Sequence, residues 1–599
     1  MYPRLLPRPR QVVALPGSCR LADLTRLEVR GLAPASLDLL RLDLPGMDLR
    51  PVDGQGCAAT LQSGGAGSLA PPSASELLAR APDHAEGFAL QVEPGGVAAA
   101  QAPAGLWYGL QALVQLRRLA PGELPAALVL DWPALRWRGV HLDLKGYQPR
   151  FESLLEYCRL LTAHRVNLLL LEVEDKFAYD GAPGVGVPGA FTAAQFRRLG
   201  EHCAALHIEV TPKLQCLGHV DYLLKHPRYR HLREADHPFQ YCPRNEEGMA
   251  LWETMMAELV ACFPGHRFFH VGADETGNLG QCPVCRPHPK ADSYVHRVGQ
   301  SLRAVARAGR QPIMWDDILR NLHGNLDAAE LERTWVLGRD AILMYWAYGY
   351  GGRGNTFPLL PRYLERGMRV WGASGLSGCG PSWIQDLPPL AERALNVSAW
   401  TAAAVHRGLE GVVATGWTRI ASADPPAEAP EAAWFPLLGA AESTWSGRER
   451  SLAEFVRAAA DSLFGADPGR ALGPALLDGA VDALCDGDGR TPRQPDRFAL
   501  LRAAAAMAHH ERLRREVDET LRMYHGKVGC RLPDYRLRLV TDRVERFAGS
   551  LAACRAGLES ALAALYEPAT VAEVLESRFG RDQQVVEEAR RLVAATRLD

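Results

Sequence analysis

Residues 137–173, WRGVHLDLKGYQPRFESLLEYCRLLTAHRVNLLLLEV, contain a strand pattern, a helix pattern and a second strand pattern in turn. The last run, VNLLLLEV at 166–173, is almost continuously apolar, which is typical of a strand buried on both faces of a parallel sheet. Strands that alternate with helices predict such a sheet. This stretch therefore predicts an α/β fold.

The same unit recurs along residues 133–449. Eight β-type runs stand at 137–143, 166–173, 208–214, 267–272, 312–317, 341–346, 369–374 and 411–417. Helical patterns separate several of them, at 151–164, 193–206, 248–263 and 294–308. Eight such units predict a (β/α)8 TIM barrel, whose active site lies at the C-terminal ends of the strands. A doubly wound open sheet is the structural alternative, but no Gly-rich phosphate loop follows the first strand.

Two further domains are expected on either side of the barrel. Residues 1–132 alternate short strand patterns with turn signals and contain an amphipathic helix pattern at 105–119. They predict a small N-terminal α+β domain without catalytic residues. Residues 450–599 are rich in Ala, Leu, Glu and Arg. They predict a C-terminal helical domain packed on the barrel.

Composition narrows the class of partner and the compartment. Lys+Arg is 67 and Asp+Glu is 69, and the resulting net charge of -2 argues against nucleic-acid or anionic-membrane binding. No secretory signal and no membrane-spanning apolar run is recognisable. Thirteen cysteines, an odd number, favour reduced thiols in a cytoplasm over a disulfide framework. We expect a cytoplasmic protein, with homo-oligomerisation left open.

Polar and aromatic side chains gather at the predicted strand ends. They include Arg138, Asp143, Glu172, Glu174, Asp175, Gln215, His219, Asp274, Glu275, Trp315, Asp316, Asp317, Trp346 and Trp417. Carboxylates and amides hydrogen-bond hydroxyl groups, and Trp faces stack on sugar C–H faces. A single Trp is more often a core residue, but three at the strand ends of one barrel favour a site. The pattern therefore suits a neutral polyhydroxylated ligand.

Asp274-Glu275 is the sharpest chemical feature. Adjacent residues at a strand end point in different directions, so different surroundings can separate their pKa values and divide acid and base roles. A bare Asp-Glu pair is usually a solvated loop. The context His270-x-Gly272-x-Asp274-Glu275 after an apolar strand favours catalysis instead.

Segment 267–276, RFFHVGADET, resembles the His-x-Gly-Gly/Ala/Cys-Asp-Glu signature of glycoside hydrolase family 20, the β-N-acetylhexosaminidases. GLWYGLQALVQL followed by DWPALRWRGVHLD is similar to the family's junction between an N-terminal domain and the barrel. TPKLQCLGHVDYL resembles the third-strand segment. PIMWDDIL, MYWAYG and GVVATGWTRIA look closest to the intracellular hexosaminidase D branch. The resemblance extends over most of residues 90–445.

The resemblance implies a cofactor-free exo-β-N-acetylhexosaminidase that removes terminal non-reducing β-linked GlcNAc or GalNAc from an oligosaccharide or glycoconjugate. It implies a retaining mechanism in which the 2-acetamido group attacks and forms an oxazolinium, an exception to the two-carboxylate scheme. Glu275 would be the general acid and then the base, and Asp274 would hold the acetamido N–H. The substrate-binding residues implied are Arg138, His219, Trp315, Trp346 and Trp417.

Two segments depart from the family pattern. The second-strand segment reads LLLLEVEDKFAYD and carries Glu172 and Asp175 where the family has histidines and an Asp-Asp pair. The seventh-strand loop, WGASGLSGCGPSW, lacks the family's Tyr for the acetamido oxygen, and Tyr348 is the candidate replacement. We include these three residues and Asp316 in the predicted substrate-binding set.

Two rival functions are also considered. A metal-dependent barrel hydrolase could use Glu172, Glu174, Asp175 and Asp316 as ligands. A non-catalytic sugar-binding barrel is disfavoured because the Asp-Glu pair and the Trp residues are present.

Cys282-x-x-Cys285-x-x-His288 resembles half a zinc site, which needs four ligands. No second CxxC completes it, although Cys242 or another distant thiol could contribute. Ordinary reduced thiols are the favoured interpretation, and no metal is expected.

Overall fold

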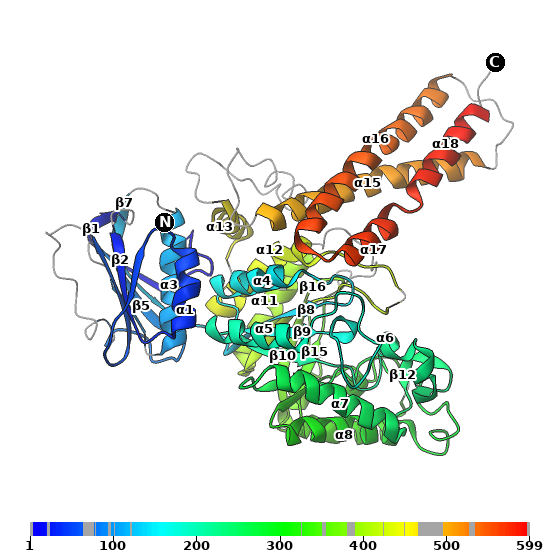
Figure 1. Cartoon of the computed structure of the whole chain (residues 1–599), viewed down its shortest axis with the longest axis horizontal. Coiled ribbons are helices and arrows are strands. Elements are labelled where there is room, and N and C mark those ends of the chain that lie inside the picture. The colour runs from blue at the N-terminus through cyan, green and yellow to red at the C-terminus, as the bar shows by residue number, and fades with distance from the viewer. Residues whose placement is uncertain are drawn as a thin grey trace.

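The protein has three structural parts in chain order, an N-terminal sheet, a closed barrel and a C-terminal group of long helices (Figure 1). The computed structural model describes residues 4–20, 24–63, 77, 79–93, 97–100, 102–119, 123–324, 326–349, 355–379, 390–422, 424–448, 450–464, 495–525 and 534–595. Residues 380–383 of the predicted seventh-strand loop lie outside this set, as do residues 465–494, 526–533 and 596–599 of the predicted helical domain.

The predicted TIM barrel is confirmed, because eight parallel strands close on themselves. The strands are β8 (Trp137–Asp143), β9 (Leu168–Glu172), β10 (Glu209–Lys213), β13 (Phe268–His270), β14 (Gln311–Trp315), β15 (Ile342–Trp346), β16 (Arg369–Ser377) and β17 (Gly411–Gly416). The open-sheet alternative is wrong.

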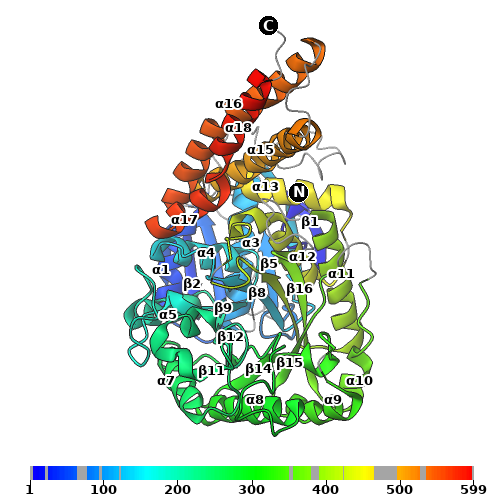
Figure 2. The same cartoon turned by 90° about the vertical axis from the view of Figure 1, so that its right-hand side faces the viewer.

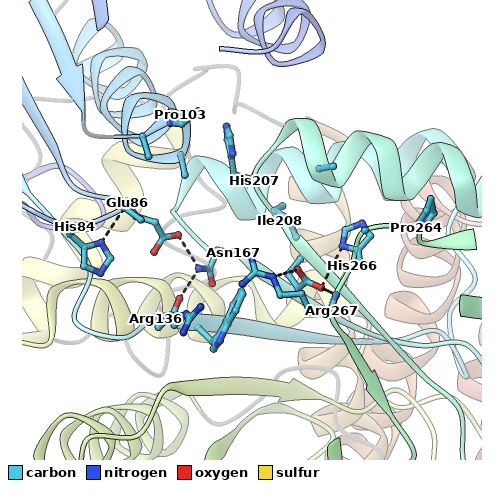
Figure 3. Close-up of a pocket in the computed structure, with 17 residues that line it drawn as sticks. His84, Glu86, Pro103, Arg136, Asn167, His207, Ile208, Pro264, His266 and Arg267 are labelled. Atoms are coloured by element: carbon cyan, nitrogen blue, oxygen red, sulfur yellow. Dashed lines mark hydrogen bonds and ion pairs between the residues drawn. The ribbon is translucent and has the colours of Figure 1, made fainter. Parts of the chain in front are cut away.

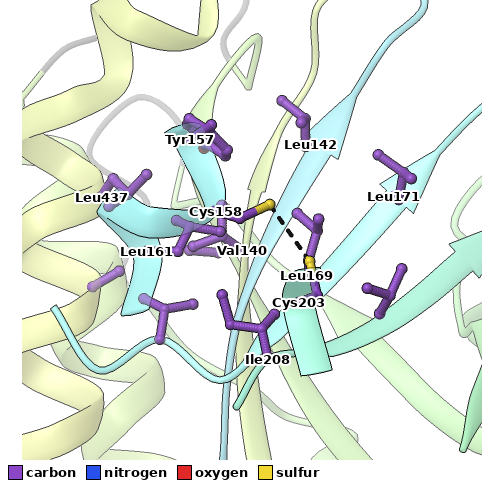
Figure 4. Packing of buried hydrophobic residues seen from close by; sticks show 14 of the residues in the cluster. Val140, Leu142, Tyr157, Cys158, Leu161, Leu169, Leu171, Cys203, Ile208 and Leu437 are labelled. Atoms are coloured by element: carbon purple, nitrogen blue, oxygen red, sulfur yellow. Dashed lines mark hydrogen bonds between the residues drawn. The ribbon is translucent and has the colours of Figure 1, made fainter. Parts of the chain in front are cut away.

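Alternating side chains of these strands build two apolar layers. Inward-facing residues such as Leu168, Leu170 and Trp315 fill the barrel interior. Outward-facing Leu169 and Leu171 belong to the core that the surrounding helices cover (Figure 4). The period of two in a strand explains why the second run is apolar throughout.

Helices surround the barrel. They are α4 (Phe151–Ala163), α5 (Ala193–Ala205), α7 (Glu246–Cys262), α8 (Lys290–Arg307), α9 (Ala328–Thr334), α10 (Leu360–Glu365), α11 (Leu390–Arg407) and α12 (Trp434–Ser446). The predicted helices at 151–164, 193–206, 248–263 and 294–308 correspond to α4, α5, α7 and α8.

The N-terminal part is a seven-stranded sheet in the order β1-β7-β5-β6-β4-β2-β3. Its strands are β1 (Gln11–Arg20), β2 (Leu24–Arg30), β3 (Asp48–Pro51), β4 (Cys57–Ser63), β5 (Phe88–Val92), β6 (Val97–Ala100) and β7 (Glu123–Asp131). Helices α1 (Pro34–Asp43) and α3 (Pro103–Leu119) lie between this sheet and the barrel (Figure 1). The α+β character expected for this region is confirmed.

The C-terminal part is helical, as predicted. It contains α13 (Leu452–Phe464), α15 (Pro495–His525), α16 (Asp534–Leu565), α17 (Pro568–Phe579) and α18 (Asp582–Ala595). Helices α15, α16 and α18 project from the barrel as an arm (Figures 1 and 2). No helix in the described segments is long and apolar enough to cross a membrane.

The base of this arm holds two loops that leave the C-terminal ends of β8 and β17. The Tyr147 ring packs edge-on against Tyr566, and its hydroxyl donates to the carbonyl of Ala427. Arg578 donates to the same carbonyl at 2.9 Å. Burial of these contacts fixes loops that would otherwise be among the least ordered parts of a barrel.

Candidate active site at the C-terminal rim

The register of the barrel strands places polar residues of four neighbouring strands side by side. Asp143 pairs with Glu172 across β8 and β9, and Glu172 pairs with Lys213 across β9 and β10. Lys213 in turn pairs with His270 of β13. The C-terminal ends of parallel strands lie together in a TIM barrel, so these side chains share one rim.

The glycine of the His270-x-Gly272-x-Asp274-Glu275 motif makes room for Gln215. Gly272 has φ +69°, and a Cβ there would lie 1.7 Å from Gln215 Oε1. Because the side chain is absent, the Gln215 amide lies against this turn and donates to Asp274 Oδ1 at 2.9 Å. The glycine is therefore needed both for its conformation and for its lack of bulk.

The backbone of the rim is held in unusual conformations. Ala273, Glu275, His219 and Glu174 all have positive φ, which is uncommon for residues other than glycine. Specific bonds hold the turn at β13, since Asp317 Oδ2 accepts from the backbone N–H of Glu275 at 2.9 Å. Such strain persists only where the surroundings fix it, and it concentrates at functional sites.

Asp274 and Glu275 share a histidine but differ in exposure. His219 Nε2 lies 3.1 Å from Glu275 Oε2 and 3.5 Å from Asp274 Oδ2. The Asp274 side chain is 9% exposed, whereas that of Glu275 is 39% exposed. One carboxylate is thus enclosed and the other is open to ligand and water.

The two surroundings move the two pKa values apart. Burial raises the pKa of Asp274 above its ordinary value, although His219 and Lys213 oppose it. Burial also acts on Glu275, but the hydrogen bond and charge of His219 outweigh it and lower its pKa. The pKa of His219 is raised, because the attraction of Asp274 and Glu275 exceeds the effect of burial.

Glu172 is the centre of a buried ionic group rather than a ligand-facing residue. Its side chain is fully buried and lies 2.7 Å from Lys213 Nζ, 3.1 Å from Lys145 Nζ and 2.9 Å from His141 Nε2. Burial raises the pKa of Glu172, but the two lysines outweigh it and hold the pKa well below its ordinary value. Its carboxylate therefore positions the two lysines.

Three of the predicted aromatic residues meet on the rim. Trp417 Nε1 donates to the Tyr348 hydroxyl at 3.0 Å, and the Tyr348 ring stacks on Trp346 with 5.2 Å between centroids. Trp346 and Trp417 are partly exposed. Trp315 is fully buried beneath them, 5.7 Å from the Trp417 ring. Trp315 therefore supports the aromatic wall formed by Trp346 and Trp417 from inside the barrel. This corrects the expectation that Trp315 lines the pocket.

Arg138 is at the wrong end of the barrel for sugar binding. It is the second residue of β8, and its guanidinium forms two bonds of 2.9 Å with Glu86 and one of 2.8 Å with the Arg165 carbonyl. The sequence-based assignment of Arg138 to the ligand is wrong, because the residue lies at the start of its strand and its donors are used there.

Beside that pair, a cleft of about 710 Å³ lies between the N-terminal part and the base of the barrel (Figure 3). Glu86 and Asn167 line it and are joined by a 2.9 Å hydrogen bond. It lies at the end opposite Asp274 and Glu275, so it is not the site that the motif predicts.

Asp175 and Asp316 each form ion pairs with basic side chains. Asp175 pairs with Lys176 and Lys225. Asp316 lies 2.8 Å from Arg320, whose guanidinium stands over the Trp346 ring at 5.0 Å. Burial raises the pKa of Asp316 to about 7. Asp316 therefore acts on the aromatic wall through Arg320.

The ligand set of the metal-dependent rival does not assemble. Within the described part of the chain, one group of side chains has metal-ligand spacing, and it contains none of Glu172, Glu174, Asp175 or Asp316. Those carboxylates are instead surrounded by lysine, histidine and arginine.

Sequence reasoning left four rim residues out of the predicted set, namely Lys145, Lys213, Gln215 and Asp317. Gln215 and Asp317 stand at recognised strand ends and contact the Asp274-Glu275 turn directly. Lys145 follows β8 by two residues and is the cation that this strand brings to the rim. Their positions at or just after the ends of β10, β14 and β8 could have identified them as rim residues.

Comparison with known proteins agrees with an active site at this rim. Residues 135–448 match the glycosyl hydrolase family 20 catalytic domain, and residues 2–132 match domain 2 of that family. The chain belongs to glycosyl hydrolase family 20. Its family 20 catalytic domain makes it a glycoside hydrolase, and its relatives include hexosaminidases.

Curated relatives of this family 20 hydrolase include Hexosaminidase D of Bos taurus, 32% identical over 47% of this chain and 84% of that protein. Hexosaminidase D of Homo sapiens is 31% identical over 47% of this chain and 60% of that protein. A mutant Streptomyces plicatus beta-hexosaminidase in complex with GlcNAc has a TM-score of 0.57 and 19% identity, covering 77% of this chain and 94% of that one. The barrel architecture is thus shared with solved family members.

Proposed function

We propose that the rim removes terminal β-linked GlcNAc or GalNAc from the non-reducing end of an oligosaccharide or glycoconjugate, with retention and with the substrate's acetamido group as nucleophile. Family membership and the hexosaminidase relatives support the activity. One observation carries the assignment of roles: Asp274 and Glu275 share His219, but only Glu275 is open to solvent.

Glu275 is the proton carrier in this proposal. In the first step the acetamido oxygen bonds to the anomeric carbon, the glycosidic C–O bond breaks, and the leaving oxygen takes the proton of Glu275. In the second step Glu275 removes a proton from water, whose oxygen attacks the same carbon and opens the oxazolinium. Its exposed carboxyl can reach both the leaving group and the water.

Asp274 holds the acetamido N–H and offsets the positive charge of the oxazolinium. Gln215 fixes one of its oxygens at 2.9 Å, so the carboxylate is oriented before the substrate arrives. A preorganised charge in an enclosed site stabilises a developing charge without further reorganisation.

The empty site favours a proton on Asp274 over one on Glu275, and substrate binding has to reverse this preference. Burial raises the pKa of Asp274, whereas His219 outweighs burial at Glu275 and lowers its pKa. An acetamido N–H that donates to Asp274 favours its ionised form. A sugar that displaces water from the exposed Glu275 strengthens the effect of burial there. Both changes favour the protonated acid and the ionised partner that the first step needs.

Glu172 and Asp316 are poorly placed to replace the acetamido nucleophile. Glu172 is fully buried and bound by two lysines, and Asp316 is fully buried beside Arg320. Neither reaches solvent, so neither is available to a sugar carbon. This supports the substrate-assisted route over a covalent glycosyl-enzyme.

The remaining rim residues bind the sugar in this proposal. Trp346 and Trp417 form the wall, and Tyr348 donates its hydroxyl proton to the acetamido oxygen. Lys145 replaces Arg138 as the cation near the sugar hydroxyls. We place the enzyme in the cytoplasm, which is supported by free thiols such as those of Cys158, Cys203 and Cys262.

The deciding experiment compares aryl β-GlcNAc and β-GalNAc with aryl β-glucoside and β-galactoside. The sugars without an acetamido group should react slower by several orders of magnitude, because intramolecular attack provides effective molarities of about 10⁵–10⁸ M. A thiazoline analogue of the oxazolinium should inhibit strongly. Trapping a glycosyl ester on a carboxylate would overturn the mechanism, and equal turnover of all four substrates would overturn the activity.

A further inference from the structure

Four side chains with metal-ligand chemistry meet next to the catalytic loop. Glu234 belongs to β11 (Arg233–Glu234), Cys242 directly follows β12 (His237–Tyr241), and Cys282 and Cys285 belong to the segment between β13 and α8. One ligand atom from each lies within 4.8 Å of the others, and all four residues are buried. Cys242 Sγ is 3.5 Å from Cys282 Sγ and 3.4 Å from Cys285 Sγ.

Glu234 supplies the second, independent observation. Its Oε1 accepts from the backbone N–H groups of Gln281 at 2.6 Å and Cys282 at 2.9 Å. Its Oε2 is buried and has no hydrogen-bond partner in the described part of the chain. A fully buried carboxylate without a cation is costly, because burying an unpaired charge is strongly unfavourable. One oxygen of Glu234 is thus held in place while the other is left for a ligand.

We propose that Cys242, Cys282, Cys285 and Glu234 bind one structural Zn²⁺. Tetrahedral zinc with bonds of about 2.3 Å to sulfur needs sulfur atoms about 3.8 Å apart, close to the separations present here. Cys and Glu are both zinc ligands in proteins. His288 is exposed and lies outside the group, and Glu234 supplies the fourth ligand instead.

A disulfide does not account for the same arrangement. Cys242 is about equally far from Cys282 and from Cys285, so a disulfide with either would leave the third thiol and the Glu234 carboxylate unpaired. A second thiol pair in the same chain shows ordinary packing. Cys158 of α4 and Cys203 of α5 lie 3.6 Å apart among leucine and valine side chains (Figure 4). That pair belongs to no metal-spaced group.

The bound ion would hold the loop that follows Glu275 in place. Cys282 stands seven residues after Glu275, and Gln240 of β12 accepts from the backbone N–H of Asn278 between them at 3.2 Å. Phe239 of the same strand packs against the His219 ring, with 4.4 Å between centroids. One ion would therefore fix both the loop that carries the acid and the hairpin behind its histidine partner. No catalytic step uses the metal.

The first test is metal analysis of the full chain, expressed with added zinc and purified under reducing conditions without chelator. We expect one zinc ion per chain, and loss of zinc in Cys282→Ser and Cys242→Ser. Cys158→Ser is the matched control and should keep its zinc. Glu234→Gln retains the three thiols and should lose zinc faster to a competing chelator. Zinc that persists in Cys282→Ser at the level of the control would overturn the proposal.

The second test needs no variant, so misfolding cannot confuse it. Zinc is removed from the wild-type chain with a thiol-reactive mercurial and chelator, the thiols are regenerated, and Co²⁺ is added. We expect the thiolate-to-cobalt charge-transfer band and visible bands of tetrahedral Co²⁺, both abolished by Zn²⁺. A folded, active chain that contains no zinc and yields no such bands would overturn the proposal. Detection of a Cys242–Cys282 or Cys242–Cys285 disulfide in the native protein would also do so.

Discussion

The two ends of the barrel use charged residues for opposite purposes, and strand β8 takes part in both. At its start, Arg138 places its guanidinium on Glu86 and on backbone carbonyls, with every donor nitrogen bonded. Beyond its end, Lys145 stands among Asp143, Glu172 and Glu174. At that end Glu174 Oε1 and His219 Nδ1 are buried without a hydrogen-bond partner in the described chain.

The difference separates stability from chemistry. Arg138 and Glu86 form a matched ion pair that joins the N-terminal domain to the barrel, whereas the crowded charges at the opposite end leave polar groups ready for a ligand. Substitutions at the two ends should therefore have different signatures. Changes at the end that carries Asp274 and Glu275 should reduce turnover more than they reduce the free energy of unfolding. Changes at the opposite end should do the reverse.

The largest effect is expected for Glu275→Gln. The amide keeps the shape of the side chain but cannot transfer a proton, so turnover should fall by about 10²–10⁴-fold. Substrates with very good leaving groups should lose less in the first step, because they need less protonation. Steady-state kinetics with a matched pair of aryl leaving groups measures this. Near wild-type turnover on poor leaving groups would remove Glu275 from the acid role.

Arg138→Met tests the other end of the comparison. It leaves the largely buried Glu86 carboxylate without its bidentate partner, and breaking such a pair costs about 3–5 kcal/mol of unfolding free energy. Denaturant titration measures the loss, and kcat per folded molecule should not change. The double variant Arg138→Met/Glu86→Gln, which removes the stranded charge, should recover part of the stability. A selective loss of sugar affinity with normal stability would restore Arg138 to the substrate site.

The sequence predicted the features that depend on local sequence patterns, but it did not predict those that depend on contacts between distant segments. The eight strands were recognisable because each is a short apolar run with its own turn signals. Asp274 and Glu275 were recognisable because they belong to one contiguous motif. Arg138 was misplaced because the run WRGVHLD does not say which of its residues reach the rim. Five residues along a strand separate Arg138 from Asp143, and that is about 16 Å.

Contacts between distant segments could not be predicted from the sequence. The match between Gly272 and Gln215 joins residues 57 positions apart, and only the folded barrel shows why that glycine is required. Glu234 stands 48 residues before Cys282, with no local pattern to connect them. The zinc half-motif was visible, but two of its four proposed ligands were supplied by a hairpin whose position depends on tertiary packing.

Asp274→Asn is expected to have the third largest effect, a loss of kcat. The amide retains bulk but loses the charge that we propose faces the oxazolinium, and removing one preorganised stabilising group costs about 10²–10³-fold in kcat. The thermal midpoint should change little, because burial already disfavours the charge of Asp274 in the empty site. Kinetics and thermal unfolding of the same preparation separate the two. A variant that unfolds readily but turns over normally would make Asp274 structural.

His219→Asn should shift the pH dependence of kcat/KM toward higher pH. Protonated His219 favours the ionised forms of both carboxylates and so lowers both pKa values. Without it, Asp274 and Glu275 both keep their protons to higher pH, so both limbs of the pH profile should move upward. Asn is chosen because it tolerates the positive φ at this position. His84→Gln, beside Glu86 at the opposite end, is the control and should not move either limb. Limbs that stay in place, or move to lower pH, would contradict the electrostatic role of His219.

The smallest effect is expected for Tyr348→Phe, which sharpens the comparison within the rim. The ring and its stacking on Trp346 are kept, but the hydroxyl that accepts from Trp417 and that we propose to donate to the acetamido oxygen is lost. One hydrogen bond contributes about 0.5–1.5 kcal/mol, so kcat should fall by up to about tenfold. Tyr147→Phe is the matched control, because its hydroxyl binds the Ala427 carbonyl in the neighbouring loop and faces no proposed substrate atom. Both variants should lose similar stability, but only Tyr348→Phe should lose kcat and affinity for the thiazoline. Equal kinetics in the two variants would assign Tyr348 to the wall alone.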